Sequence, residues 1–178
     1  MSLDGFIAGP NDEHGNGLGD DGWPLHEWIE SGDPQGAAFL QEMIEGLGVL
    51  MMGRHGYEVV DWGPTAYFNR PVYVLTHHPP EENPVVRGDT FHFIDDGLEA
   101  AIARAKEEAG DGVVALHGAS LVQQALRAGL LDEIIIHLVP ILLGDGKRLF
   151  ASPIDQVRLD PIRVLDTPRA THLHYRVV

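Results

Sequence analysis

The sequence predicts an α/β protein of three layers, in which helices cover both faces of a mostly parallel sheet. Short apolar runs typical of buried parallel strands alternate with stretches in which apolar residues recur at helical spacing. The alternation is repeated along the chain before an antiparallel pair of strands ends it, as in a three-layer domain. With 178 residues, 44% of them hydrophobic, the chain can bury one substantial core, and we expect a single domain over residues 1–178.

Composition excludes several classes of function. The 12 basic residues against 27 acidic residues give a formal net charge of −15, which repels polyanions, so no nucleic-acid partner is expected. The lack of cysteine excludes disulfides, thiolate nucleophiles and cysteine-based zinc sites. No apolar segment approaches the roughly 20 residues of a membrane span, and no charged-then-apolar leader opens the chain. We therefore expect a cytoplasmic protein that does not bind membranes.

The first element is predicted to be a strand over residues 2–10 that ends at a Gly-Pro break. Asp4 lies inside this otherwise apolar run, where a carboxylate needs a partner or a purpose. Two interpretations are open. Asp4 is a partly buried carboxyl group with a raised pKa that can donate a proton, or it accepts hydrogen bonds from backbone amides at a bulge made by Gly5.

A long polar segment over residues 11–35 follows, and it carries Trp23 and Trp28 beside Glu27. Such a loop can form the lid and wall of a pocket for a flat heterocycle, with Glu27 as a second candidate proton donor. The alternative is that both rings fill the edge of the core. Apolar residues at helical spacing then predict a helix over residues 37–47 that docks one face on the sheet.

The next two strands both end at basic residues. An apolar run over residues 49–52 leads into Gly53-Arg54-His55, and a strand over residues 71–76 leads into His77-His78. Free backbone amides at the first junction, together with Arg54, can hold a phosphate. The histidines add to a local positive field at the ends of these strands.

The stretch from Val113 to Phe150 is the strongest functional clue. A buried-type strand stops at His117-Gly118-Ala119-Ser120, a helical pattern runs from Leu121 to Gly129, and an apolar strand over residues 133–139 follows, expected to be central in the same sheet. The helix start is a candidate pyrophosphate site because its first amides lack partners and lie at the positive end of the dipole. The alternative is that Gly118 only permits a turn and Ser120 only caps the helix.

The C-terminal part is predicted to contain a loop and a hairpin. Residues 140–146 form an apolar turn, with Pro140 and Leu143, that can line a ligand site. Residues 157–166 and 171–178 read as two antiparallel strands. His172 and His174 share a face of the last strand; cross-strand packing explains them better than a metal site, and we expect no metal.

The sequence resembles the dihydrofolate-reductase-like family, in the branch related to the C-terminal reductase domain of the bifunctional riboflavin-biosynthesis deaminase-reductase. The resemblance covers nearly the whole chain, and its segments occur in the family's order. It rests on MSLDGFIAGPND, VLMMGRHGYE, PVYVLTHHPP, GLLDEIIIHLVPILLGDGKRLF and THLHYRVV. It implies a dihydrofolate-reductase-like fold, NADPH as cofactor and a homodimer.

The resemblance also implies which residues hold the cofactor and the substrate. Ile7 and Ala8 would face the nicotinamide amide, and the remaining cofactor positions would be at the strand ends. Those positions are Gly53, Arg54, His55, Thr76, His77, His78, His117, Gly118, Ala119, Ser120 and Leu121. Trp23, Pro140 and Leu143 would line the substrate pocket.

Two classes of function follow from these observations. The first is an NADPH-dependent reductase that transfers a hydride to a small pterin- or pyrimidine-like heterocycle, or to a conjugated carbonyl compound, with Asp4 and Glu27 as catalytic carboxyls. The second is a non-catalytic nucleotide- or heterocycle-binding protein on the same fold. Four departures from the residues usual in the family suggest it: His117 in place of glycine, Gly56 in place of threonine, Phe6 in place of lysine and Leu116 in place of glutamate.

Overall fold

The structure, a computed structural model, describes residues 1–60, 70–81, 85–86, 89–150 and 156–178. Its main sheet has five strands in the order β4-β5-β3-β2-β6. All neighbours in this sheet are parallel except the short β4, which pairs antiparallel to β5. Its strands are β2 (Leu47–Gly53), β3 (Val72–Leu75), β4 (Val85–Val86), β5 (Asp89–Ile94) and β6 (Val113–His117).

Helices cover both faces of this sheet because its strands are apolar on both sides. On one face, helices α3 (Leu98–Ala109) and α4 (Ala119–Arg127) pack against Val49, Met51 and Tyr73. The other face contains Leu50, Met52, Val72, Val74 and Phe91. The short α2 (Arg54–Val59) places Tyr57 against it. The predicted three-layer arrangement around a mostly parallel sheet is confirmed.

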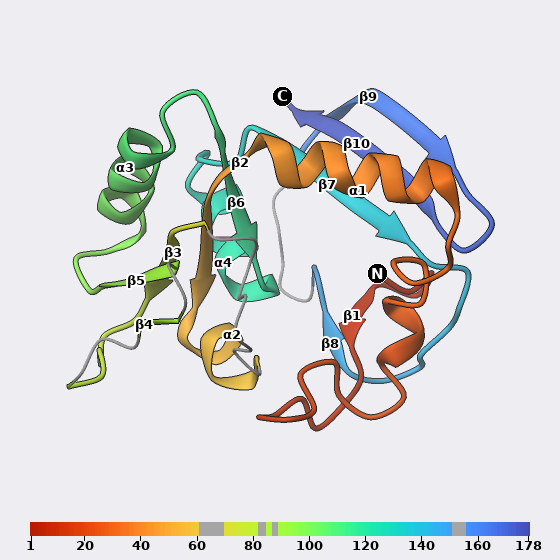
Figure 1. Cartoon of the computed structure of the whole chain (residues 1–178), viewed down its shortest axis with the longest axis horizontal. Helices are drawn as coiled ribbons and strands as arrows, with labels where there is room; N and C mark the ends of the chain where they lie inside the picture. Colours follow the sequence, from red (N-terminus) through yellow and green to blue (C-terminus); the bar gives the residue numbers. More distant parts are fainter. Residues whose placement is uncertain (61–69, 82–84, 87–88, 151–155) are drawn as a thin grey trace.

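A second sheet is antiparallel and consists of the strands β7-β10-β9. They span Glu133–Leu138 (β7), Leu159–Asp166 (β9) and Thr171–Val177 (β10). Helix α1 (Pro34–Gly46) lies along this sheet in Figure 1. Glu42 of α1 pairs with Arg163 of β9 at 2.8 Å. The predicted C-terminal hairpin is confirmed. The expected central position of residues 133–139 in the parallel sheet is wrong, because β7 pairs with β10 and β6 lies at the edge of its sheet.

The N-terminal strand is shorter than predicted. Strand β1 (Phe6–Ala8) pairs with β8 (Lys147–Arg148) and does not extend over residues 2–10. Gly5 has φ +93, a conformation that ends regular strand pairing, and Ser2 before it is fully buried. The polar segment after β1 folds into turns and a short 3-10 element, η1 (Trp23–Leu25), before Asp33 caps α1.

Candidate functional site

Three strand ends meet at one edge of the parallel sheet. Strands β3, β2 and β6 are parallel neighbours, and their register places Gly53 beside Leu75 and Met52 beside His117. The turns that follow these strands therefore lie side by side, where ligands of open α/β sheets bind. The predicted convergence of the Gly53, Thr76 and His117 segments matches this register.

A cavity of about 300 Å³ lies at this edge, between α2 and the end of β3. Arg54, Thr76 and His78 line it together with Tyr57 and Phe93. It brings together a cation, a hydroxyl, an imidazole and two aromatic rings, which suit a phosphate attached to a flat ring. The carboxylates of Glu58 and Glu81 also line it, and Glu58 is paired with Arg54.

Arg54 connects the two sides of this cavity. Its Nη1 donates a hydrogen bond to the carbonyl of His78 at 2.9 Å, and its Nε pairs with the Glu58 carboxylate at 2.5 Å. The backbone N–H of His78 in turn donates to the Thr76 hydroxyl at 3.1 Å. The segment after β3 is thereby held to α2, and about half of the Arg54 side chain stays exposed to solvent.

The glycine turn after β6, at Gly118, has open space beside its backbone. Gly118 has φ +94 and precedes α4 without a side-chain cap, and a Cβ added there would meet no atom of the described residues within 4 Å. A Cβ added at Gly53 would likewise meet no described atom within 4 Å. Ser120 does not cap the helix; its hydroxyl accepts a hydrogen bond from Gln124. Ala119 and Leu121 are buried, so only their backbone can face a ligand.

His117 lies against α2. A Cβ added at Gly56 would be 3.7 Å from its Nδ1, so the imidazole is beside the glycine of α2. His117 is an exposed residue, but desolvation of its ring against α2 lowers its pKa, which favours the neutral ring. The ring stands next to the turn at Gly118, and the space in front of that glycine remains open.

The ring of His55, a predicted cofactor residue, contacts the N-terminal loop. Its Nε2 lies 2.6 Å from the carboxylate of Asp12, which also binds Lys147 of β8. Burial raises the pKa of Asp12, but the hydrogen bonds from Lys147 and His55 outweigh it and lower the pKa overall. The contact connects α2, the loop and β8. Nothing in the sequence pattern singled out Asp12.

Asp4 is an ionised carboxylate that anchors a loop. It accepts hydrogen bonds from the Ser2 hydroxyl at 2.6 Å and from the backbone amides of Leu143 and Gly144 at 3.1 and 2.8 Å. The Ser2 hydroxyl and then these amides lower the pKa of Asp4 to about 2. The raised pKa expected for a proton donor is therefore wrong. The amide-bonding interpretation fits, although the amides belong to residues 143–144 and not to a bulge at Gly5.

The other predicted residues occupy separate positions. Glu27 pairs with Arg169 at 3.3 Å at the surface. Trp28 is buried while Trp23 is 56% exposed, so one ring fills the core and the other faces solvent. Ile7 and Ala8 lie in β1, and the carbonyl of Ala8 closely approaches Gly146. Leu143 packs at the edge of an apolar cluster, and Pro140 is exposed.

A pair of histidines, of which His172 is fully buried and His137 partly buried, was not predicted. His137 of β7 lies opposite His172 of β10, with 2.7 Å between their Nδ1 atoms. His174 instead binds Glu133 at 2.7 Å. The antiparallel register of β7 and β10 would have revealed the pair, because it places residues 137 and 172 opposite each other. In the described residues, no three potential metal ligands gather in one group.

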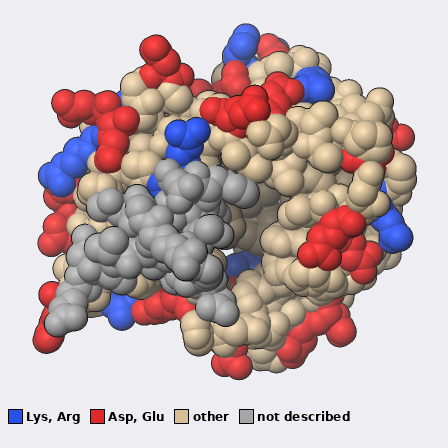
Figure 2. Space-filling model, in the orientation of Figure 1, with Lys and Arg blue, Asp and Glu red and all other residues tan. Residues whose placement is uncertain are grey.

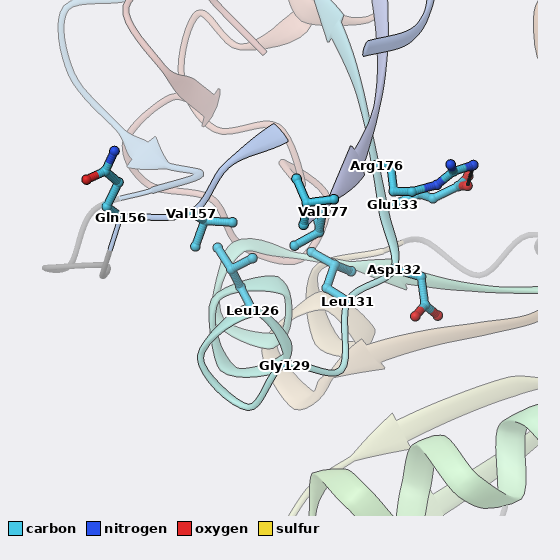
Figure 3. Close-up of a pocket in the computed structure, with 10 residues that line it drawn as sticks. Leu126, Gly129, Leu131, Asp132, Glu133, Gln156, Val157, Arg176 and Val177 are labelled. Carbon is cyan, nitrogen blue, oxygen red and sulfur yellow. Dashed lines mark ion pairs between the residues drawn. The ribbon is translucent and has the colours of Figure 1, made fainter. Parts of the chain in front are cut away.

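A larger cavity of about 560 Å³ lies at the other end of α4. In Figure 3, Leu126, Leu131, Val157 and Val177 point toward one another, and the Glu133–Arg176 ion pair lies at the side. Gly129, at the end of α4, also borders it, whereas the turn at Gly118 is at the helix start. None of the predicted site residues lines this cavity.

The charged side chains on the molecular surface are mostly acidic. Figure 2 shows Asp and Glu side chains spread over one face, which is hollowed near its middle. No described helix combines the length and apolar character needed to cross a bilayer.

Comparisons with known proteins agree with the fold. The sequence is 27% identical over 177 residues to YwjB, an uncharacterised protein of Bacillus subtilis, covering 98% of this chain and 92% of that protein. A crystal structure of a candidate riboflavin biosynthesis protein from Shewanella sp. PV-4 superposes with a TM-score of 0.73 at 25% identity, covering 100% of this chain and 95% of that one.

Two more distant structures show the same fold. The bifunctional diaminohydroxyphosphoribosylaminopyrimidine deaminase/5-amino-6-(5-phosphoribosylamino)uracil reductase of Thermotoga maritima has a TM-score of 0.69 at 14% identity, covering 100% of this chain and 54% of that one. Dihydrofolate reductase from Enterococcus faecalis, in complex with NADP(H), has a TM-score of 0.52 at 19% identity, covering 81% and 82%. The profile of the RibD C-terminal domain matches residues 1–173. The chain therefore belongs to the RibD C-terminal domain family and has a dihydrofolate-reductase-like, reductase-type fold.

Proposed function

We propose that the protein is a cytoplasmic NADPH-dependent reductase that transfers a hydride to a small pterin- or pyrimidine-like heterocycle or to a conjugated carbonyl compound. The observation that carries this proposal is the cavity at the end of β3. There Arg54, Thr76 and His78 converge beside the turns at Gly53 and Gly118. Membership of a reductase-type family supports the same function.

The residues at this edge fit a dinucleotide. The cavity offers Arg54 and His78 to a phosphate, with Tyr57 and Phe93 as apolar walls. A pyrophosphate can approach the backbone closely at Gly118 because none of the described residues fills the space where a Cβ would be. The remaining contacts are assigned as the resemblance implies, with His77 at the phosphate end and Ile7 and Ala8 at the nicotinamide.

In this proposal the protein supplies binding and orientation. NADPH, when bound, supplies the hydride. Asp4 stays ionised at neutral pH and holds the backbone of Leu143 and Gly144, which orients one wall of the substrate site. Glu27 is then the remaining carboxyl candidate for a proton donor.

The test is a binding titration followed by a turnover assay. NADPH, NADH and flavin are titrated separately while tryptophan fluorescence is recorded, and we expect saturable binding with NADPH preferred. NADPH oxidation is then measured with pterins, pyrimidines and quinones. Binding without oxidation across this panel would favour the non-catalytic binding protein. Failure of all three nucleotides to bind would contradict both functions.

A further inference from the structure

The geometry of the buried histidine pair determines how many protons it holds. His137 and His172 face each other across neighbouring strands, with their Nδ1 atoms 2.7 Å apart. This separation is a hydrogen bond, so one of the two nitrogens carries a proton and the other accepts it. Two protonated nitrogens would repel each other, and two bare nitrogens would have no bond to hold them together.

The surrounding hydrogen bonds determine which nitrogen is the donor. The hydroxyl of Thr167 donates its single proton to the carbonyl of Ala170 at 2.7 Å. It can therefore only accept from Nε2 of His172, 3.3 Å away. His172 thus carries its proton on Nε2 and accepts at Nδ1. His137 carries its proton on Nδ1, which leaves its Nε2 unprotonated.

Aromatic rings from two other segments enclose the pair. Trp28 stacks on His137 with centroids 4.4 Å apart and meets the edge of His172 at 4.9 Å. Phe39 of α1 lies 5.9 Å and 5.1 Å from the same two rings. Trp28 belongs to the segment of residues 23–31, and its ring joins this segment to the β7–β10 sheet. The pair and Trp28 therefore form one packed unit.

This enclosure opposes any additional proton on the pair. Burial, followed by His172, the N-terminal amino group and His26, lowers the pKa of His137 to about 3. Burial also lowers the pKa of His172, with Arg163 acting in the same direction and Asp33 in the opposite one. The titratable and charged groups that act on the pair come from several segments: the N-terminal Met1, His26 after η1, Asp33 at the cap of α1 and Arg163 of β9.

We propose that His137 and His172 form a pH-sensitive clasp that holds residues 23–31 on the antiparallel sheet. The clasp is closed while both imidazoles are neutral and opens when the pair takes up an additional proton. Acid opening separates Trp28 from His137 and leaves the secondary structure of both sheets intact. The inference uses only this packed unit and does not depend on the proposed reductase activity.

The size of the effect follows from proton linkage. A histidine in the open form has an ordinary pKa of about 6.5, whereas His137 in the closed form has a pKa of about 3. Acidification from pH 8 to pH 5 should then raise the open-to-closed ratio about 30-fold through His137 alone.

The first experiment tests the tautomers directly. Nitrogen chemical shifts of the imidazoles are measured by NMR at pH 7.5 on the wild-type protein. We expect a protonated Nδ1 and bare Nε2 for His137, and the reverse for His172. An imidazolium at either position, or the opposite tautomers, would overturn the clasp.

The second experiment tests opening. Amide exchange of His26, Ile29 and Ser31, whose N–H groups are hydrogen-bonded within the segment, is measured at pH 8 and pH 5. Protection is expressed relative to the amides of α3, which removes the intrinsic pH dependence of exchange. We expect wild-type protection to fall about 30-fold at pH 5. Unchanged relative protection would contradict the proposal.

Variants separate the pair from other histidines. The double variant His137→Asn/His172→Asn keeps a hydrogen bond between two non-titrating amides and should show no pH-dependent loss of protection. His174→Asn, on the same strand but bound to Glu133, should behave as wild type. A pH response in the double variant equal to that of wild type would refute the clasp. If the double variant does not fold, the imidazole tautomers measured on the wild-type protein decide whether the clasp exists.

Discussion

At the scale of single residues, hydrogen-bonding partners decide the roles of the charged groups at the candidate site. Arg54 has a structural contact to the carbonyl of His78 and still presents about half of its side chain to solvent at the cavity. Asp4 lies on an apolar element, yet three donors make it a stronger acid than a free carboxyl. Position in the sequence identified both residues, but only the hydrogen bonds of the folded chain determined what each side chain does there.

Arg54→Ala should weaken NADPH binding. Loss of a charge-assisted hydrogen bond to a phosphate costs about 1.5–3 kcal/mol, which corresponds to a Kd raised roughly 10-fold to 150-fold. The matched control is Arg158→Ala, which removes the same charge outside the cavity. Fluorescence titration of both variants gives the comparison. Equal affinities of wild type and Arg54→Ala would exclude Arg54 from the cofactor site.

Asp4→Asn should destabilise the turn at residues 143–144 without changing NADPH affinity. Because the folded pKa of Asp4, about 2, is below the ordinary value near 4, its stabilising contribution is present above pH 4 and is lost as pH falls toward 2. Wild-type Tm should therefore fall more steeply over this range than the Tm of the variant, as measured by thermal unfolding. Asp160→Asn on the exposed strand β9 is the control. Parallel curves for wild type and Asp4→Asn would contradict the anchoring role.

At the scale of elements, the turns that leave the parallel strands differ in backbone geometry although they look alike in sequence. Both junctions begin with glycine and lead into a helix. Gly118 has φ +94, whereas Gly53 has φ −80. A Cβ added at either glycine would meet no described atom within 4 Å, so neighbouring residues crowd neither position. The two turns therefore differ in backbone conformation. Only the turn before α4 requires a residue without a side chain.

Gly118→Ala should destabilise the protein by about 1–2 kcal/mol because an alanine is strained at positive φ. Gly53→Ala, at a φ that any residue adopts, should change the free energy of unfolding by less than about 0.5 kcal/mol. Urea unfolding of the two variants measures both values. A Gly118→Ala variant as stable as Gly53→Ala would show that the positive φ is not maintained in solution.

At the scale of the whole molecule, strand β9 carries exposed apolar side chains on an acidic protein. Val164 and Ile162 of β9 are 59% and 42% exposed. Arg163 between them contacts Glu42 and Phe39 of α1, so Val164 points to the opposite face of the sheet. Within the described residues, β9 pairs with β10 alone. An exposed apolar strand of this kind favours association with another chain.

We propose that a second copy of the chain covers β9, giving a homodimer. Light scattering coupled to size exclusion should give twice the 19.5 kDa mass of one chain. Val164→Lys should shift the protein to the monomer, because it would place a charge in the apolar contact. Leu3→Lys, at an apolar side chain exposed elsewhere, should leave the dimer intact. A wild-type monomer at micromolar concentration would contradict the dimer.

Particular residues show which features of the fold and site could be predicted from the sequence. The apolar runs and glycine junctions predicted the strands that end at Gly53 and His117, since buried strands and tight turns depend on local residue type. The same reasoning placed residues 133–139 in the wrong sheet, because an apolar strand can pair with any neighbour that covers it. It also missed Asp12, whose partners His55 and Lys147 are distant in the chain.

The sequence by itself determined the alternation of strands and helices, the acidic surface, the cysteine-free chemistry and the grouping of Arg54, Thr76 and His78 at neighbouring strand ends. These features depend on residue type and short-range order. Only the tertiary structure decided that Asp4 is ionised, that Trp28 is core, and that His137 and His172 face each other with 2.7 Å between their Nδ1 atoms. Those outcomes depend on which groups, far apart in the chain, are brought within hydrogen-bonding distance and removed from water.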